Sequence, residues 1–255
     1  MNKVVSRDEW LEARKALLAK EKAMTRQRDE LSAQRRELPW VKIDKDYVFD
    51  TPGGKRTLSD LFDGRSQLII KHFMLAPGQE DGCVGCSFET DHIESALQHI
   101  EHHDVTFVNV ARATLPEIEA YKKRMGWRCK WVSSFGSDFN YDFDASFTKE
   151  QIDKGEAYYN YKKGKVPLED LSGFSVFTKN DKGEIFHTYS TFGRGAEEVM
   201  SSYMLLDLTP KGRNENGPNF DLTDWVRHHD RYQSDGHVNE KGRWVAAPAL
   251  AGCCS

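Results

Sequence analysis

Two cysteines separated by two residues are the feature of this sequence best suited to chemistry. They are Cys83 and Cys86, with Val84 and Gly85 between them. A thiolate attacks a disulfide sulfur, and a second thiol nearby displaces the mixed disulfide that results. The pattern predicts thiol–disulfide exchange in which Cys83 is the more exposed nucleophile and Cys86 is the buried resolving thiol.

The flanking residues predict how this dithiol is positioned. Residues 67–74 (QLIIKHFM) form a buried strand pattern, a loop with Pro77 and Gly78 follows, and residues 87–101 have apolar positions at helical spacing. The pair would therefore begin a helix, where free backbone N–H groups and the helix dipole stabilise a thiolate.

Acidic residues near the start of this helix act against that stabilisation. They are Glu80, Asp81, Glu89 and Asp91. Because nearby carboxylates disfavour a thiolate, we expect a less depressed pKa for Cys83 than in strongly oxidising dithiol enzymes. The couple should then work on the reducing side.

A zinc site is the competing interpretation of the same cysteines. Cys83, Cys86, His99 and His103 match the spacing of a two-Cys, two-His finger. A continuous helix over 87–99 would put His99 roughly 18–20 Å from Cys86, whereas zinc ligands lie within about 2.3 Å of the metal. We therefore expect no metal and no cofactor.

The other cysteines are assigned smaller roles. Cys253 and Cys254 could relay electrons to the dithiol, or belong to a frayed terminus with exposed thiols. Cys129, beside an expected strand, is interpreted as a small buried hydrophobic residue.

An aromatic loop over residues 131–143 is the expected substrate-binding element. Its candidates are Trp131, Phe135, Phe139 and Tyr141. Large rigid side chains of this kind either line an apolar pocket or cap the edge of a sheet, and the sequence leaves both interpretations open.

The elements around these residues alternate between strand and helix. Expected strands at 67–74, 104–111 and 130–132 are separated by expected helices at 87–101 and 116–125, and a hairpin (174–178 and 184–189) and a closing helix (195–206) follow. This alternation predicts an α/β protein with a mainly parallel sheet.

A helical arm precedes this domain. Ser6 to Glu9 fits a capping box, and apolar residues then recur every seven residues; these are Trp10, Leu17, Met24, Leu31 and Leu38. Charged residues interrupt a second apolar line, so the arm either packs on its own domain or mediates a homodimer. The expected division is an arm (1–40), a domain (41–209) and a C-terminal extension (210–255) with a flexible Cys-Cys tail.

Composition excludes several classes of partner. The chain has 38% apolar and 30% charged residues with a net charge of −4, so no basic field favours nucleic acid or an anionic membrane. The first residues lack the apolar region of a secretory signal. We expect a cytoplasmic protein whose five cysteines stay reduced.

Residues 58–232 resemble a bacterial family of unknown function whose members are described as thioredoxin-like, predicted dithiol-disulfide oxidoreductases. The resemblance rests on GCVGCSF (82–88), IEAYKKRMGW (118–127), WVSSFGSDFNYDF (131–143), FHTYST (186–191) and LLDLTPKGR (205–213). It implies a thioredoxin-like fold, here with a long N-terminal helix and a C-terminal extension. It also implies a reaction class but no substrate. The partners that we expect are a disulfide or small thiol-reactive substrate and an unidentified electron donor.

The sequence also departs from familiar thioredoxin-like proteins. Val84 and Gly85 replace the usual Pro-containing pair, and residues 171–173 lack the proline expected before the strand facing the dithiol. A peroxiredoxin-like thiol peroxidase is an alternative, although Glu80 and Ala76 occupy the places of that family's Thr and Pro. A binding or redox-sensor protein without turnover is a further alternative.

Overall fold

A computed structural model describes residues 2–219 and 221–248. The chain divides into two compact units, Met1–Trp40 and Val41–Ser255, which are described separately. None of the described helices combines the length and apolar character needed to cross a bilayer.

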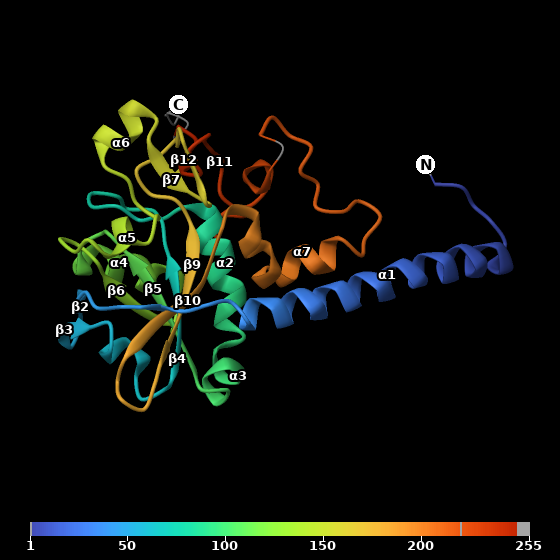
Figure 1. Cartoon of the computed structure of the whole chain (residues 1–255). Helices are drawn as coiled ribbons and strands as arrows, with labels where there is room; N and C mark the ends of the chain where they lie inside the picture. Colours follow the sequence, from blue (N-terminus) through green and yellow to red (C-terminus); the bar gives the residue numbers. More distant parts are fainter. Residues whose placement is uncertain (1, 220, 249–255) are drawn as a thin grey trace, which may run out of the picture. The chain divides into compact units, whose positions relative to one another are not determined.

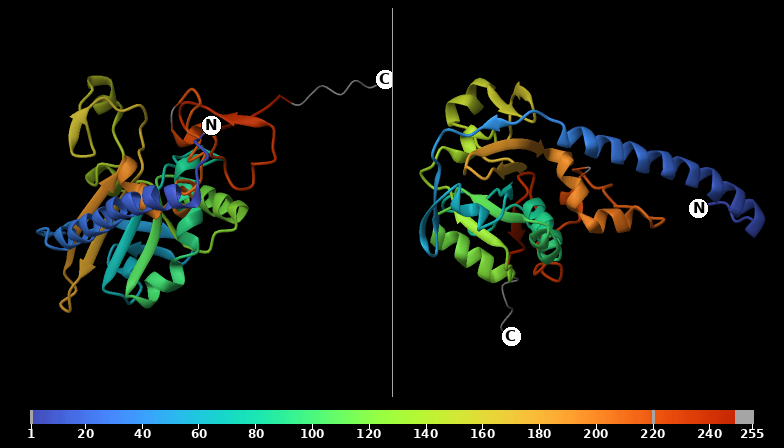
Figure 2. Two further views of the ribbon diagram at one scale, coloured as in Figure 1. Left: turned by 90° about the vertical axis from the view of Figure 1, so that its right-hand side faces the viewer. Right: turned by 60° about the horizontal axis from the view of Figure 1, so that its bottom comes forward.

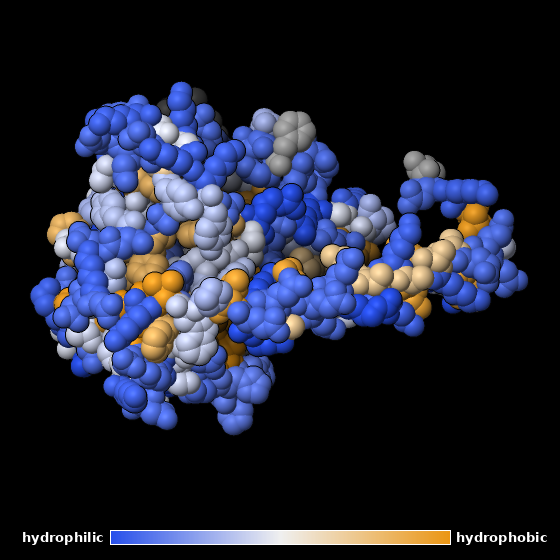
Figure 3. Space-filling view, viewed as in Figure 1, coloured by the Kyte–Doolittle hydropathy of each residue, from blue (hydrophilic) through white to orange (hydrophobic). Residues whose placement is uncertain are grey.

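The first unit is built on one long helix, α1 (Arg7–Arg36). Ser6 caps it through a capping box with Glu9, as the sequence predicts. Its apolar line stays exposed, from 44% at Trp10 to 71% at Met24, and apolar and polar atoms mix along the helix in Figure 3. Pairing of two copies through this helix stays a prediction.

The second unit is organised around an eight-stranded sheet with the order β1-β10-β9-β4-β5-β6-β2-β3. Strands β4, β5 and β6 are parallel, and the other pairings are antiparallel. Figures 1 and 2 show β4 and β5 at its centre. The strands are β1 (Val41–Lys42), β2 (Val48–Thr51), β3 (Gly54–Thr57), β4 (Gln67–His72), β5 (Val105–Ala111), β6 (Lys130–Ser133), β9 (Gly173–Lys179) and β10 (Ile185–Phe192).

Each face of this sheet has its own core because side chains alternate along a strand. Three helices pack on one face, and their core includes Cys86, Ile118 and Trp131. These are α2 (Val84–Glu94), α3 (Leu97–His102) and α4 (Leu115–Met125). The other face is covered by the 3-10 helix η1 (Asp60–Phe62) and by α5 (Phe139–Asp142).

Two expected helices are interrupted, so the prediction that each is continuous is wrong. Residues 87–101 are divided between α2 and α3, because the hydroxyl of Ser95 donates to the carbonyl of His92 and competes with the helical pattern. The closing helix is divided into η2 (Gly193–Val199) and α7 (Ser201–Leu206).

The remaining elements lie in insertions and after α7. They are α6 (Lys149–Lys154), β7 (Ala157–Tyr159), β8 (Lys162–Gly164), η3 (Leu222–Asp224), β11 (Gly236–Val238) and β12 (Trp244–Ala246). Residues after α7 pack on α2 through a third core, which joins Val84 and Phe88 to Val226 and Val238. The architecture is thioredoxin-like α/β with a long N-terminal helix and a C-terminal extension, as expected.

Candidate active site

The dithiol lies where strand β4 leads into helix α2. Cys83 is the N-cap of α2, and Cys86 lies in its first turn. Met74 accepts the backbone N–H of Cys83 at 3.1 Å, and the Cys83 carbonyl accepts the N–H of Ser87 at 3.0 Å. Cys83 is half-buried, Cys86 is 1% exposed, and both are free thiols.

A buried ion pair lies beneath the dithiol. Lys71 on β4 is fully buried, Glu89 on α2 is 4% exposed, and their charged groups are in contact. The ammonium of Lys71 also lies 4.5 Å from the ring centre of Phe174. A buried charge persists only when it is paired and hydrogen-bonded, and here the pair lies near the thiol of Cys86.

Ser172 connects this ion pair to the loop that precedes strand β9. Its hydroxyl accepts a hydrogen bond from the ammonium of Lys71 and donates to Glu89 at 3.4 Å. Its carbonyl accepts the hydroxyl of Tyr159 at 2.7 Å. The loop is therefore held against the base of the site.

The two sulfurs share a hydrogen bond that shifts their pKa values in opposite directions. Burial alone would raise the pKa of Cys86, but the hydrogen bond with Cys83 and the charge of Lys71 outweigh it and lower that pKa. The Met74 backbone and the Ser172 hydroxyl act in the same direction. The hydrogen bond with Cys86, followed by burial, raises the pKa of Cys83 well above that of an ordinary thiol. The negative charge is thus favoured on the inner sulfur.

The direction of the Cys83 pKa agrees with the expectation, but its cause is different. Carboxylates near the helix start are paired with other groups: Asp81 with Arg124, and Glu89 with Lys71. Asp91 accepts the indole N–H of Trp127 at 2.7 Å. The neighbouring sulfur and burial, rather than this acidic group, raise the pKa of Cys83.

The C-terminal extension covers the dithiol. The carbonyl of Gly242 accepts the N–H of Val84, the first N–H of α2, at 3.1 Å. A Cβ at Gly242 would lie 3.4 Å from the Sγ of Cys83, and φ at this residue is +68°, which favours glycine. Arg243 donates to the carbonyls of Met74 and Asp81 at 3.2 and 2.7 Å. The turn between β11 and β12 therefore belongs to the site.

A cavity of about 370 Å³ adjoins this turn. Lys241 and Arg243 line it from the extension, and Glu169 and Asp170 line it from the loop that continues to Ser172. Arg112, which follows β5, holds Asp170 through two hydrogen bonds of 2.6 and 2.9 Å. The same arginine donates to the hydroxyl of Tyr141 at 3.0 Å.

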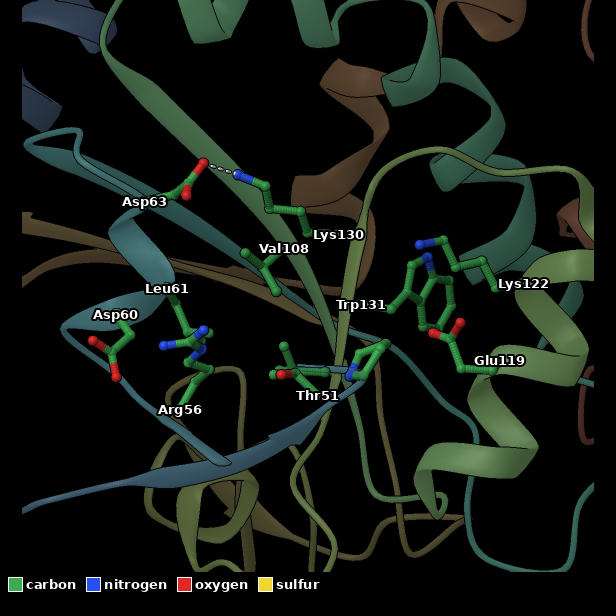
Figure 4. A pocket seen from close by; sticks show the side chains of 12 residues that line it. Thr51, Arg56, Asp60, Leu61, Asp63, Val108, Glu119, Lys122, Lys130 and Trp131 are labelled. Atoms are coloured by element: carbon green, nitrogen blue, oxygen red, sulfur yellow. Dashed lines mark hydrogen bonds and ion pairs between the residues drawn. The ribbon is translucent and has the colours of Figure 1, made fainter. Parts of the chain in front are cut away.

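The four aromatic candidates are not gathered into one surface. Trp131 belongs to the core on the dithiol side of the sheet and Phe139 to the core on the other side. Trp131 also borders a separate pocket with Arg56 and Lys130, shown in Figure 4. Phe135 is 55% exposed. A role in substrate binding stays a prediction for these side chains.

The other sequence candidates lie outside this site or outside the described residues. Cys129 is 3% exposed, and burial raises its pKa. Within the described parts of the chain, no three His, Cys, Asp or Glu side chains form a group able to hold a metal ion. Cys253 and Cys254 lie outside the described residues.

Sequence reasoning missed Lys71, Ser172 and the turn at Gly242, and it named Glu89 without its pairing to Lys71. Lys71 lies within the apolar run of residues 67–74 (QLIIKHFM). Because lysine is rarely fully buried without a partner, its position there could have indicated a buried ion pair. The partner groups come from distant segments, which no local pattern identifies.

A different polar group is buried on the opposite face of β4. His72 is 1% exposed and hydrogen-bonds Ser175 at 2.9 Å, and Ser190 links Ser175 to His187 at 2.9 and 2.7 Å. The imidazole stacks on Phe139 at 5.6 Å. Burial, aided by the charge of Lys71, lowers the pKa of His72 to about 3, so this imidazole is neutral.

Residues 1–232 match the family DUF899, described as a bacterial protein of unknown function. No curated protein matches the chain. Among solved structures, peroxiredoxin Q of Xanthomonas campestris is similar with 14% identity and a TM-score of 0.43, over 66% of this chain and 96% of that one. Peroxidoxin BcpB of Mycobacterium tuberculosis is similar with 10% identity and a TM-score of 0.43, over 65% and 95%.

Proposed function

The chain belongs to the bacterial family DUF899, and we propose that it is a dithiol-disulfide oxidoreductase acting through Cys83 and Cys86. One observation carries the proposal: a half-buried thiol at a helix N-terminus lies against a buried thiol whose pKa is lowered by a neighbouring buried lysine. Thiolate stabilisation of this kind is typical of reactive rather than structural cysteines.

In the first step Cys83 attacks the substrate disulfide. As its sulfur bonds to one substrate sulfur, the S–S bond breaks and the other sulfur leaves as a thiolate. The Cys83 proton passes to the Sγ of Cys86, its hydrogen-bond partner. Cys83 is then joined to the substrate in a mixed disulfide.

In the second step Cys86 attacks the Sγ of Cys83. Its proton moves through the hydroxyl of Ser172 to the carboxylate of Glu89, with which that hydroxyl is hydrogen-bonded at 3.4 Å. The second substrate thiolate leaves as the Cys83–Cys86 disulfide forms, and the proton on Glu89 neutralises it. A reduced dithiol from another molecule must then restore the pair.

The reducing direction is part of the proposal. The exposed sulfur keeps its proton until attack, unlike the stabilised outer thiolate of strongly oxidising dithiols. A cytoplasmic location, where glutathione and thioredoxin keep thiols reduced, suits that direction. A reduction potential near that of periplasmic oxidants would contradict it.

The proposal is tested with bis-hydroxyethyl disulfide and insulin as substrates. Cys83→Ser should lower turnover at least about a hundredfold, because the attacking sulfur is gone. Cys86→Ser should trap a mixed disulfide on Cys83 that mass spectrometry detects, and Cys129→Ser serves as the matched control. Equal rates in wild-type and Cys83→Ser protein would refute the proposal. Consumption of hydrogen peroxide without disulfide reduction would favour the thiol peroxidase instead.

A further inference from the structure

The cavity beside the dithiol holds unequal charges. Lys241 and Arg243 line it together with two carboxylates, Glu169 and Asp170. A third cation, Arg112, does not line the cavity but pairs with Asp170. The carboxylates are already satisfied within the protein: Asp170 by Arg112, with Ser146 donating a further hydrogen bond at 2.6 Å, and Glu169 by Arg112 at 3.4 Å.

The cations of the extension are not neutralised in this way. Among the described residues, Lys241 has no side-chain partner, and Arg243 donates only through Nη1, to two carbonyls. Because backbone carbonyls carry no net charge, both positive charges remain available to a ligand in the cavity.

These cations lie next to the attacking sulfur. Gly242, between Lys241 and Arg243, approaches the Sγ of Cys83, and the charge of Arg243 acts on that thiol. Met74 offers one carbonyl to both Arg243 and the backbone of Cys83. Neither cysteine lines the cavity, but the turn that carries both of its cations touches Cys83.

The size of the cavity and the cover over Cys83 limit the substrate. The volume of about 370 Å³ is within the range of small-molecule sites. The turn at Gly242 occupies the first N–H of α2, where an extended protein segment would otherwise approach the dithiol.

We propose that the substrates are small disulfides bearing carboxylates, held by Lys241 and Arg243 in the cavity beside Cys83. This inference rests on the proposed disulfide exchange and adds a substrate class to it. Binding places one substrate sulfur against Cys83, and both product thiols carry away a carboxylate that the cations had held.

Three small disulfides of similar length but different net charge test whether the charge of the substrate sets its rate of reaction. Dithiodipropionate is a dianion, bis-hydroxyethyl disulfide is neutral, and cystamine is a dication. The full chain is reduced, freed of reductant and mixed with each, and the loss of protein thiols is timed. We expect dithiodipropionate to react fastest and cystamine slowest, with the difference shrinking as salt is added.

Lys241→Gln tests the residue directly. It should slow the reaction of dithiodipropionate by roughly three- to tenfold and speed that of cystamine, and the rate with the neutral disulfide should change less than either of these two rates. Lys182→Gln, at an exposed turn between β9 and β10, should change none of the three rates.

Each outcome separates this inference from the proposed function. If the reduced protein reacts with none of the small disulfides and does not reduce insulin, the proposed function fails. If all three react at rates independent of charge, or if cystamine is fastest, exchange stands and the carboxylate preference is wrong. Faster reaction with insulin than with every small disulfide would overturn the size limit.

Discussion

Lys71 and His72 are neighbours on strand β4, yet they meet opposite environments. Lys71 is turned toward the dithiol, in contact with Glu89 and Ser172. His72 is turned to the other face, where it bonds Ser175 and stacks on Phe139. Both are buried polar groups, and burial lowers the pKa of each. Lys71 is paired with a carboxylate on the dithiol side, whereas His72 lies within a chain of hydroxyl hydrogen bonds. Burial alone therefore does not distinguish the two faces; the groups that each side chain contacts do.

Breaking the ion pair of Lys71 and Glu89 should produce the largest change, a loss of stability. Lys71→Met leaves Glu89 as an uncompensated buried charge, which we expect to lower the free energy of unfolding by about 3–5 kcal/mol. Adding Glu89→Gln should restore most of that loss, because no unpaired charge remains. Urea unfolding of the single and double variants measures both effects; equal stability of the two would mean that the pair is not buried as described.

The double variant then isolates the chemical role of the pair. Removing the positive charge disfavours the thiolate of Cys86, so the pKa of Cys86 should rise toward the ordinary thiol value of about 8.5. Turnover near neutral pH should fall at least about tenfold. Thiolate absorbance against pH and disulfide reduction are the measurements. His72→Phe is the control on the opposite face, and an effect of that change on the thiolate titration would remove the contrast.

On the opposite face, His72 should affect how the free energy of unfolding depends on pH. The pKa of His72 is lowered to about 3 from 6.5, so the unfolded chain takes up a proton first as pH falls. Stability is therefore full above the unfolded value and is lost between about 6.5 and about 3. When the pH falls from about 7 to about 5.5, protonation of this imidazole in the unfolded chain should lower the free energy of unfolding by about 1.2 kcal/mol. Urea unfolding at both pH values measures this change. The free energy of unfolding should fall by about 1.2 kcal/mol more in wild-type protein than in His72→Phe protein.

The smallest expected effect is at the link between the pair and the inner thiol. Ser172→Ala removes a hydrogen bond to Cys86 and the proposed proton path to Glu89. We expect the second step to slow by about fivefold, since a hydrogen bond contributes about 1 kcal/mol and about 1.4 kcal/mol corresponds to a tenfold change in rate. Release of the second substrate thiol after rapid mixing measures that step. Ser175→Ala, which removes a buried hydroxyl bonded to His72 on the opposite face, is the matched control.

The sequence predicts the dithiol and its frame because both depend on local patterns. The spacing of Cys83 and Cys86 and the alternation of strands and helices are visible within short windows. Lys71 was assigned to a strand, but its burial depends on Glu89 and on Ser172, 101 residues away from it. The interruption at Ser95 depends on one side-chain hydrogen bond. Periodicity does not report such contacts, and the cover over Cys83 was missed for the same reason.

The turn at Gly242 is synthesised much later than the segment that carries the dithiol. Arg243 bonds Met74 across 169 residues of sequence, and domains form as the chain is synthesised from its N-terminal end at about 5–20 residues per second. Strand β4 and helix α2 therefore leave the ribosome well before the segment that covers Cys83. During that interval of roughly ten seconds or more, the attacking thiol lacks its cover, and a nascent chain is more open to oxidants than the finished protein.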